Sequence, residues 1–301
     1  MNRIGIDLGG TKIAAVRMDP NGAILERQRV ETPKTYAECL DALAALVSRL
    51  EADEREPCPV GIGHPGSLSP VTGLMRNANS TWLNGRPFAQ DIEARLDRPV
   101  RLANDADCFT LSEAIDGAGQ GGRIVFGVIL GTGVGGGIAI EGRLLQGAQG
   151  IAGEWGHNPL PWANESDVPV PQCWCGKLSC HETWLSGPGL ARDHATRHGG
   201  MLTAAEIFAA AETGDPTARQ TAERHGDRLA RGLASVLNII DADIIVLGGG
   251  VSNAPGLAER VTQRLPAYLF SDTLRTRIVT HAHGDSSGVR GAAWLWPAET
   301  R

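Results

Sequence analysis

The sequence lacks a hydrophobic run of the roughly 20 residues that a transmembrane helix requires. Its start, MNRIGIDLGG, also lacks the apolar core of a secretory signal peptide, because Asp7 and several glycines interrupt the hydrophobic residues. These two absences predict a cytoplasmic protein without a membrane partner.

Blocks of lysine and arginine are absent as well, and the 301 residues carry a formal net charge of -6. General nucleic-acid binding depends on clustered positive charge, so we expect no nucleic-acid partner. The composition favours a small molecule as the ligand. A chain of this length is typical of two domains or one large domain.

Disulfides are not expected, because thiols stay reduced in the cytosol. Three of the six cysteines, Cys39, Cys58 and Cys108, are scattered among apolar residues and are interpreted as small buried side chains. The other three lie close together in QCWCGKLSCHET (172–183), which follows EWGHNPLPW (154–162). This spacing is typical of a metal site.

Short apolar runs that end in glycine or a polar turn alternate with helical patterns, which predicts an α/β protein. The predicted strands are Arg3–Leu8, Val60–Gly63, Val100–Ala103, Ile124–Leu130 and Ile244–Leu247. The longest predicted helix extends from Pro216 to about Ile240.

Two segments share one design: GIDLGGTKIAAV (5–16) and GVILGTGVGGGIAI (127–140). Each has an apolar strand, a glycine-rich turn and a second apolar strand, which indicates two related halves. The flexible loop GAGQGG (117–122) is the expected boundary between them.

Each of these glycine turns is either a simple hairpin turn or a phosphate clamp, because successive backbone amides in such turns can converge on phosphate oxygens. Neither is a Walker loop or a dinucleotide fingerprint. In the first turn, Asp7 can hold Mg²⁺ through water, and Thr11 and Lys12 can donate to phosphate. The second turn has Ile129 at the position of Asp7, so the two halves are not chemically equal.

Two further segments have alternative interpretations. LGGGVSN (247–253) follows a predicted strand and is either a tight connection to a helix or part of an adenosine pocket. Asp105 lies where VRLA gives way to a helix, so it is either an N-cap or a base that accepts a proton from a hydroxyl. Asn104 could fix the same substrate.

Together these segments resemble the ROK family of sugar kinases (repressor, open reading frame, kinase), over nearly the whole chain. The segments that carry the resemblance are DLGGTK (7–12), ANDAD (103–107), GTGVGGG (131–137), GEWGH (153–157), CWCGKLSCHE (173–182) and LSGPGL (185–190). NANSTWLNG (77–85), NPLPW (158–162) and HGDSSGVRGAAWLWP (283–297) are most similar to the bacterial fructokinases, also called mannokinases, of that family.

The resemblance implies an α/β, actin-like ATPase fold of the ribonuclease H-like type, with two related domains around a nucleotide and sugar cleft. The expected N-terminal domain is 1–117, completed by a C-terminal helix at 286–301. The expected second domain is 118–285 and includes the zinc loop. A homodimer is also expected.

The resemblance also assigns the site. Asp105 matches the general base. The sugar-binding residues are expected to be Asn104, Asp105, Glu154, His157 and Glu182. The residues expected to bind ATP and Mg²⁺ are Asp7, Gly9, Gly10, Thr11, Lys12, Gly131, Thr132, Gly133, Gly135, Gly249 and Gly250. The expected Zn²⁺ ligands are His157, Cys173, Cys175 and Cys180.

Three thiolates and one imidazole fill a structural zinc site and leave no position for a metal-bound water, so metal catalysis is the weaker interpretation. The alternative is a set of buried cysteines without a metal. Glu154 lies three residues before His157, and Glu182 lies two residues after Cys180, so one ion would hold both carboxylates. Because the glycine turns lie far along the chain, we expect metal loss to impair sugar binding more than ATP binding.

These observations predict an ATP-dependent hexose kinase, with transfer to the 6-hydroxyl of fructose, or also of mannose, as the main expectation. The alternatives are an N-acetylglucosamine kinase or glucokinase of the same family, and a noncatalytic sugar-sensing ROK protein. One departure from the family pattern is His64 in GIGHPG, where family members commonly carry an apolar residue or proline. It is either a packing variant or a determinant of substrate preference.

Overall fold

The computed structural model describes residues 1–297 and divides into two compact units. The first unit contains Met1–Gln120, Gly142–Ala152 and the C-terminal segment from Asp285. The second contains Gly121–Glu141 and Gly153–Gly284. The structure differs from the expected division after residue 117, because residues 118–120 and 142–152 also belong to the first unit.

The first unit is built on a five-stranded sheet with the order β3-β2-β1-β4-β7. The first three strands pair antiparallel, and β4 and β7 continue the sheet in parallel. This register places Asp7 beside Gly63 and His64 beside Asn104. The strands are β1 (Arg3–Leu8), β2 (Lys12–Met18), β3 (Ile24–Glu31), β4 (Val60–His64) and β7 (Val100–Asn104), with a small ribbon of β5 (Ser67–Leu68) and β6 (Met75–Arg76).

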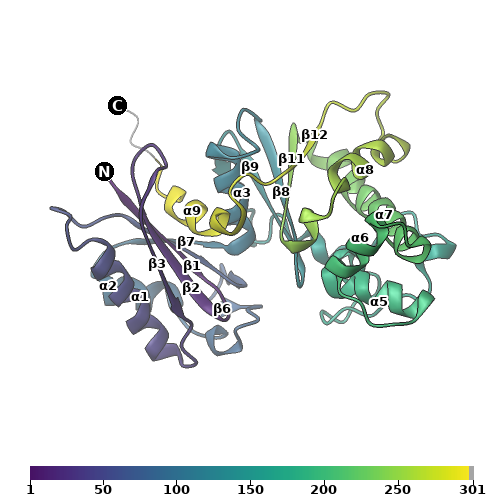
Figure 1. Cartoon of the computed structure of the whole chain (residues 1–301). Coiled ribbons are helices and arrows are strands. Elements are labelled where there is room, and N and C mark those ends of the chain that lie inside the picture. The colour runs from purple at the N-terminus through teal and green to yellow at the C-terminus, as the bar shows by residue number, and fades with distance from the viewer. Residues whose placement is uncertain (298–301) are drawn as a thin grey trace. The chain divides into compact units, whose positions relative to one another are not determined.

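Helices cover the sheet of the first unit (Figure 1). They are α1 (Tyr36–Leu50), α2 (Phe88–Leu96), α3 (Asp105–Asp116) and α9 (Ser287–Trp294), and η1 (Thr81–Leu83) is a 3-10 turn. Helix α1 shows how the sequence specifies these elements. Thr35 caps its first turn by accepting the amide of Glu38. Its apolar residues recur every three or four positions and form one buried face, with Cys39, Leu43, Leu46, Val47 and Leu50.

The C-terminal helix α9 is a component of the first unit, and Figure 1 shows it in yellow against the purple strands. Its contact with α3 is so close that a Cβ on Gly291 would lie 1.6 Å from the carbonyl oxygen of Cys108. Only glycine permits this approach. The helix occupies part of the expected range 286–301, of which residues 298–301 lie outside the described residues.

The second unit repeats the design of the first. Its strands follow the order β9-β8-β11-β12, with β8 and β9 antiparallel and the others parallel to β8. The corresponding order in the first unit is β2-β1-β4-β7, so the repeated sheet confirms the two related halves. The strands are β8 (Ile124–Leu130), β9 (Val134–Ile140), β11 (Ile244–Gly248) and β12 (Arg277–Thr280), and β10 (Arg143–Leu144) follows β9 in the chain.

The remaining elements lie in the second unit, apart from η6 (Gly284–Ser286), which leads into α9. The helices are α4 (His181–Leu185), α5 (Gly187–His198), α6 (Ala204–Glu212), α7 (Pro216–Ile240) and α8 (Leu257–Arg264). The 3-10 turns are η2 (Trp155–His157), η3 (Glu165–Asp167), η4 (Gly250–Asn253) and η5 (Leu265–Ala267). The predicted long helix is confirmed as α7, with a cap from Asp215 and proline at its first position.

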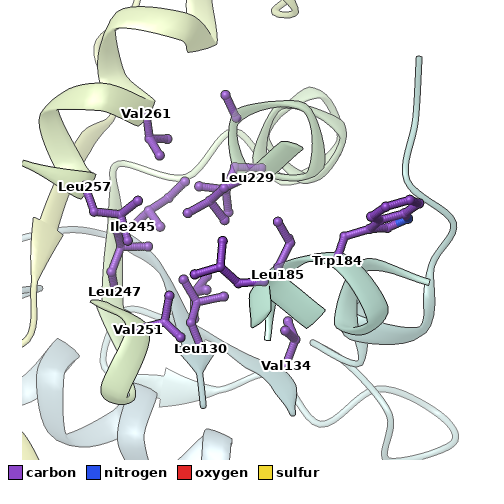
Figure 2. Close-up of a cluster of buried hydrophobic side chains, with 14 of the residues drawn as sticks. Leu130, Val134, Trp184, Leu185, Leu229, Ile245, Leu247, Val251, Leu257 and Val261 are labelled. Atoms are coloured by element: carbon purple, nitrogen blue, oxygen red, sulfur yellow. The ribbon is translucent and has the colours of Figure 1, made fainter. Parts of the chain in front are cut away.

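The core of the second unit anchors its glycine turn (Figure 2). Leu130 and Val134 stand at the two ends of the turn and are buried together with Leu185, Leu247 and Val251. Burial of such side chains contributes about 1.5–3 kcal/mol each. The turn is therefore held at the edge of a packed core.

Among residues 1–297, no helix has both the length and the hydrophobicity that a membrane crossing requires.

Candidate functional site

The first glycine turn joins β1 to β2 in the first unit. Buried Leu8 and Ile13 anchor its ends, while Thr11 and Lys12 are exposed between them. The backbone closes through a hydrogen bond from the amide of Gly9 to the carbonyl of Lys12, at 3.1 Å. Gly10 is also exposed, so this turn presents its backbone and its one cation to solvent.

Two carboxylates of the first unit, Asp7 and Asp105, influence each other. Asp7 is the penultimate residue of β1, and Asp105 begins α3 directly after β7, which lies two strands from β1 in the same sheet. Burial and the charge of Asp105 raise the pKa of the Asp7 carboxyl to about 6. Desolvation by the surrounding protein raises the pKa of Asp105, against the lowering effect of its hydrogen bond from the Ala106 amide, although the side chain still reaches solvent. A bound cation would relieve this repulsion.

The structure assigns the helix cap to Asn104 rather than to Asp105. The Asn104 side chain accepts the amide of Ala106 at 2.7 Å, and its own amide donates to the carbonyl of Gly66 at 3.1 Å. Asp105 is instead the first helical residue. The alternative interpretation of Asp105 as an N-cap is therefore wrong, and its exposed carboxylate is placed at the carboxyl end of β7.

His64 is a buried packing residue. It lies at the end of β4, its ring packs edge-on against Phe88 at 6.3 Å, and its Nδ1 lies 3.2 Å from the Pro65 carbonyl. Burial lowers the pKa of its imidazole to about 4, so the ring is neutral at physiological pH. These contacts favour the packing interpretation over direct sugar recognition.

The second glycine turn joins β8 to β9 in the second unit. Its amide at Gly131 donates to the carbonyl of Gly133 at 2.9 Å, and the amide of Gly187 donates to the Gly131 carbonyl at 2.8 Å. Thr132 is exposed at the tip. On β9, the carbonyl of Gly135 accepts the indole of Trp155 at 3.0 Å, which fixes the segment that carries Glu154 and His157.

The same turn lines a cavity of about 710 Å³ that lies wholly within the second unit. Gly131 and Thr132 form one side of it, and Gly250 forms another. The structure thus brings the second and third glycine clusters to one cavity. Neighbouring Gly249 has a φ of +82°, and a Cβ there would lie 2.5 Å from the carbonyl of Leu130, so only glycine fits.

Most of the cavity wall comes from residues that the sequence analysis did not single out. Pro188 and Ala191 belong to α5, and Ala204 and Phe208 belong to α6. They give the cavity an apolar surface suited to a flat ring. The one sequence signal was LSGPGL (185–190), which contains Pro188 but none of the other three and was noted only as part of the family pattern.

The four expected metal ligands converge in the second unit. The ligand atoms of His157, Cys173, Cys175 and Cys180 all lie within 4.8 Å of one another. Two separations are 3.6 Å, from Cys173 Sγ to His157 Nδ1, and 3.7 Å, between the Sγ atoms of Cys175 and Cys180. Tetrahedral zinc would place such atoms about 3.5–3.8 Å apart. These residues therefore fit a tetrahedral metal ion.

Glu182 connects this cluster with the second glycine turn. Its Oε2 accepts the amide of Val134, directly after the turn, at 3.1 Å. Its Oε1 accepts the indole N–H of Trp174, which lies between Cys173 and Cys175 in the chain, at 2.6 Å. The expected separation of the metal loop from the nucleotide turn thus holds along the chain but not in space. Glu154 lies in the same unit, exposed, at the start of η2.

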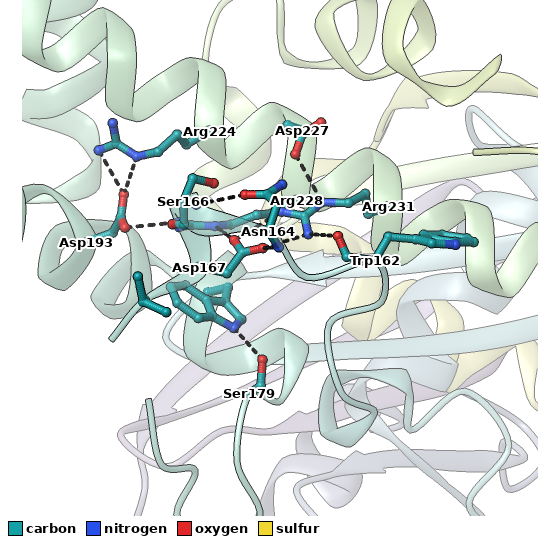
Figure 3. A network of polar contacts seen from close by, with 12 residues as sticks. Trp162, Asn164, Ser166, Asp167, Ser179, Asp193, Arg224, Asp227, Arg228 and Arg231 are labelled. Atoms are coloured by element: carbon teal, nitrogen blue, oxygen red, sulfur yellow. Dashed lines mark hydrogen bonds and ion pairs between the residues drawn. The ribbon is translucent and has the colours of Figure 1, made fainter. Parts of the chain in front are cut away.

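A buried ionic network holds the segment between His157 and Cys173 (Figure 3). Asp167 is 2% exposed and accepts from Arg228 at 2.9 Å and from Arg231 at 2.8 Å. Both arginines lie on α7 and are themselves fully buried. Arg228 also pairs with Asp193 on α5 at 3.0 Å, and its guanidinium lies 4.2 Å from the Trp184 ring. The segment between His157 and Cys173 is therefore anchored to α7 independently of any ion.

Comparison with known proteins now places the chain. The model of the ROK family matches residues 3–299. N-acetyl-D-glucosamine kinases of Escherichia coli O6:H1 (strain CFT073) and Shigella flexneri are each 43% identical over 298 residues, which is 97% of this chain and 98% of theirs.

Solved structures of ROK family proteins are also similar to this chain. A ROK hexokinase from Thermus thermophilus has a TM-score of 0.86 and 33% identity, with 97% of each chain covered. A ROK family glucokinase from Streptomyces griseus, in complex with glucose and AMPPNP, has a TM-score of 0.77 and 30% identity, with 98% of this chain and 99% of that one covered.

These matches define a protein of the α/β, actin-like ATPase fold, which confirms the predicted fold class. The chain belongs to the ROK family. The narrower expectation, a closest likeness to fructokinases, is not supported, because the relatives described above are N-acetylglucosamine kinases.

Proposed function

We propose that this ROK protein is an ATP-dependent sugar kinase whose preferred acceptor is N-acetyl-D-glucosamine. The observation that carries the choice of sugar is 43% identity, over almost the whole chain, to N-acetyl-D-glucosamine kinases. This is the alternative of the sequence analysis, and it replaces fructose as the main proposal. The glucose and AMPPNP complex of the Streptomyces griseus relative supports a sugar and an adenine nucleotide as the substrates.

In the first unit, Asp105 is the proposed general base. Its carboxylate is exposed at a strand end, and the hydrogen bonds of Asn104 to Ala106 and Gly66 fix the neighbouring backbone. Asn104 lies beside it as a proposed sugar ligand. The turn formed by Gly9, Gly10 and Thr11, with Lys12, would bind phosphate through its backbone amides, hydroxyl and ammonium.

In the second unit, the proposed nucleotide residues surround the cavity and turn already described. The apolar wall from α5 and α6 suits the adenine ring, and Gly250 also lines the cavity, with Gly249 preceding it in the chain. Gly131, Thr132, Gly133 and Gly135 would contact phosphate from the second turn. Glu154, His157 and Glu182 are the proposed sugar ligands of this unit.

The proposed reaction transfers the γ-phosphoryl group of ATP to the primary hydroxyl at C6 of the sugar. Asp105 accepts the hydroxyl proton while the sugar oxygen bonds to phosphorus and the bond to the ADP oxygen breaks. The amides of the glycine turns and Lys12 stabilise charge on the transferring group. Mg²⁺, when bound, would neutralise phosphate charge, and Asp7 is the carboxylate that would hold it through water.

The substrate proposal is tested by measuring ATP consumption with N-acetylglucosamine, fructose, mannose and glucose at matched concentrations. We expect N-acetylglucosamine to have the highest kcat/KM, by at least about tenfold, because a site that hydrogen-bonds an acetamido group rejects sugars that lack it. A reaction without sugar gives the background hydrolysis. If fructose or glucose gave the highest value, the choice of sugar would be wrong, and if no sugar stimulated ATP consumption, a noncatalytic sugar sensor would replace the kinase.

We further propose that the metal is Zn²⁺ and that its role is structural. Four protein ligands complete a tetrahedral shell, so the ion would hold the loop that carries Cys173, Cys175 and Cys180 to the segment that carries His157. His157 would coordinate through Nδ1, the atom that faces Cys173, and present the rest of its ring to the sugar.

Substituting Cys175→Ser should therefore lower the metal content from about one ion per chain and raise the sugar KM by about tenfold or more, because sub-ångström placement of Glu182 and His157 is lost. The ATP KM should rise less, because the Gly187 amide still holds the turn at Gly131. Metal analysis and steady-state kinetics measure both effects. Cys58→Ser, outside the cluster, is the control and should retain the metal. An unchanged sugar KM in a metal-free Cys175→Ser protein would refute the coupling.

The homodimer and the cytoplasmic location expected from the sequence also stay proposals. The mass of the purified chain in solution tests the first, and fractionation of cells that produce it tests the second. Neither is required for the chemistry proposed above.

A further inference from the structure

We infer that Trp174 is a positioning residue that holds Glu182 in place for sugar binding. The inference rests on the proposed function, because it concerns how one proposed sugar ligand is oriented. Trp174 lies between the metal ligands Cys173 and Cys175, and its side chain is 72% exposed. An exposed tryptophan in a tight loop contributes little to a hydrophobic core. The contacts of its side chain therefore give a better reason for a tryptophan at this position than burial does.

Two contacts of the Trp174 side chain involve proposed sugar ligands. Its indole N–H donates to Oε1 of Glu182 at 2.6 Å. Its ring lies edge-on to the imidazole of His157, with ring centres 5.0 Å apart and an interplanar angle of 86°. A charged acceptor makes the first of these a strong hydrogen bond.

The two oxygens of Glu182 thus have different anchors. Trp174 holds Oε1, and the backbone amide of Val134 holds Oε2 at 3.1 Å. The Val134 anchor is a backbone amide, so a side-chain substitution at position 174 does not remove it. The Trp174 anchor is a side chain, and it is the one that fixes the rotation of the carboxylate. Loss of the indole N–H would leave the carboxylate free to turn about its bond to Val134, so part of the sugar-binding energy would be spent on ordering it.

The chain offers a matched control. Trp162 lies in the same unit, is 50% exposed, and stacks on Tyr268 with ring centres 5.5 Å apart. Trp174→Phe and Trp162→Phe make the same chemical change at two exposed positions. Both variants should fold and keep the metal ion, because neither residue lies in the core or ligates the metal.

The experiment measures sugar affinity by calorimetry with N-acetylglucosamine. We expect Trp174→Phe to raise the sugar Kd about fivefold, as the cost of ordering one freed side chain on binding implies, and Trp162→Phe to leave it within about twofold. In a Glu182→Gln background, Trp174→Phe should add less than about a twofold change, because its effect passes through the carboxylate. Equal effects of the two tryptophan variants, or full additivity with Glu182→Gln, would overturn the inference.

A second readout needs no substrate. In the nitrogen-15 spectrum of the indole groups, the signal lost in Trp174→Phe identifies the Trp174 N–H. That signal should move when Glu182→Gln is introduced, while the Trp162 signal should not. If the wild-type protein binds no sugar while Glu182→Gln still shifts the Trp174 signal, the proposed function is refuted and the contact is established. An unmoved Trp174 signal would refute the inference alone.

Discussion

Replacing Asp105 by asparagine is expected to lower kcat by about 10² or more while sugar binding largely survives. Asparagine keeps the shape and hydrogen-bonding capacity of the side chain but cannot accept the proton of the sugar hydroxyl. The surrounding protein raises the pKa of Asp105, so the wild-type rate should fall as the pH drops through that raised pKa. The variant has no titrating group at this position and should lack that part of the pH profile.

Steady-state kinetics over a pH series, together with calorimetric sugar binding, tests this expectation. Asp53→Asn is the matched control, since Asp53 is an exposed aspartate of the same unit that lies in the turn after α1. It should leave both kcat and the pH profile unchanged. An Asp105→Asn protein with near wild-type kcat would remove Asp105 from the chemistry.

The second large effect concerns stability. Substituting Asp167→Asn should lower the free energy of unfolding by about 3 kcal/mol, because it removes a charge that compensates two buried guanidinium groups. Arg228 and Arg231 keep their bonds to Asp193 and Asp227, which places the loss at the lower end of the range for a broken buried pair. Denaturant unfolding of the wild type and variant measures this difference.

The stability difference between wild type and Asp167→Asn should also depend on pH, in a direction that the pKa of Asp167 determines. Burial would raise the pKa of the Asp167 carboxyl, but hydrogen bonds from Arg231, the Asn164 amide and Arg228 outweigh it and lower the pKa. A lowered pKa stabilises the fold above the unfolded-state value of about 4, and this contribution is lost as the pH falls through the folded-state value. The difference between wild type and variant should therefore narrow below about pH 4.

Asp41→Asn is the control for the ionic network. Asp41 pairs with Arg95 on the surface, where both side chains are more than half exposed, so its loss should change stability by less than about 1 kcal/mol. If Asp167→Asn cost no more than this control, the network would contribute nothing specific to the fold.

Local patterns predicted much of the fold. Apolar runs bounded by glycine located β1 and β8 to the residue, and proline after aspartate, with helical periodicity, located α7. The tight spacing of Cys173, Cys175 and Cys180 indicated one cluster, because residues so close in sequence must also be close in space. These signals are local, and tertiary structure had little freedom to change them.

Long-range contacts were not predictable in this way. Nothing in the sequence near Glu182 indicates that its carboxylate accepts the amide of Val134, 48 residues away. The same holds for Asp167, whose partners lie 61 and 64 residues further along the chain. The apolar cavity wall from α5 and α6 was missed for a related reason, since small apolar residues on a helix have the same pattern whether they face a core or a ligand. The proposal of N-acetylglucosamine rests on comparison with relatives, because the fine shape of a site is not a local property.

The place of α9 in the first unit has a consequence for the order in which the protein is made. Ribosomes synthesise a chain from its N-terminus, at roughly 5–20 residues per second, and domains tend to fold as they emerge. Strand β1 therefore emerges before the second unit, but the helix that packs within its own unit, Ser287–Trp294, emerges after it. All of the second unit precedes that helix in the chain. We infer that the second unit can fold during synthesis while the first must wait until α9 has emerged, an order that limited proteolysis of ribosome-bound chains would reveal.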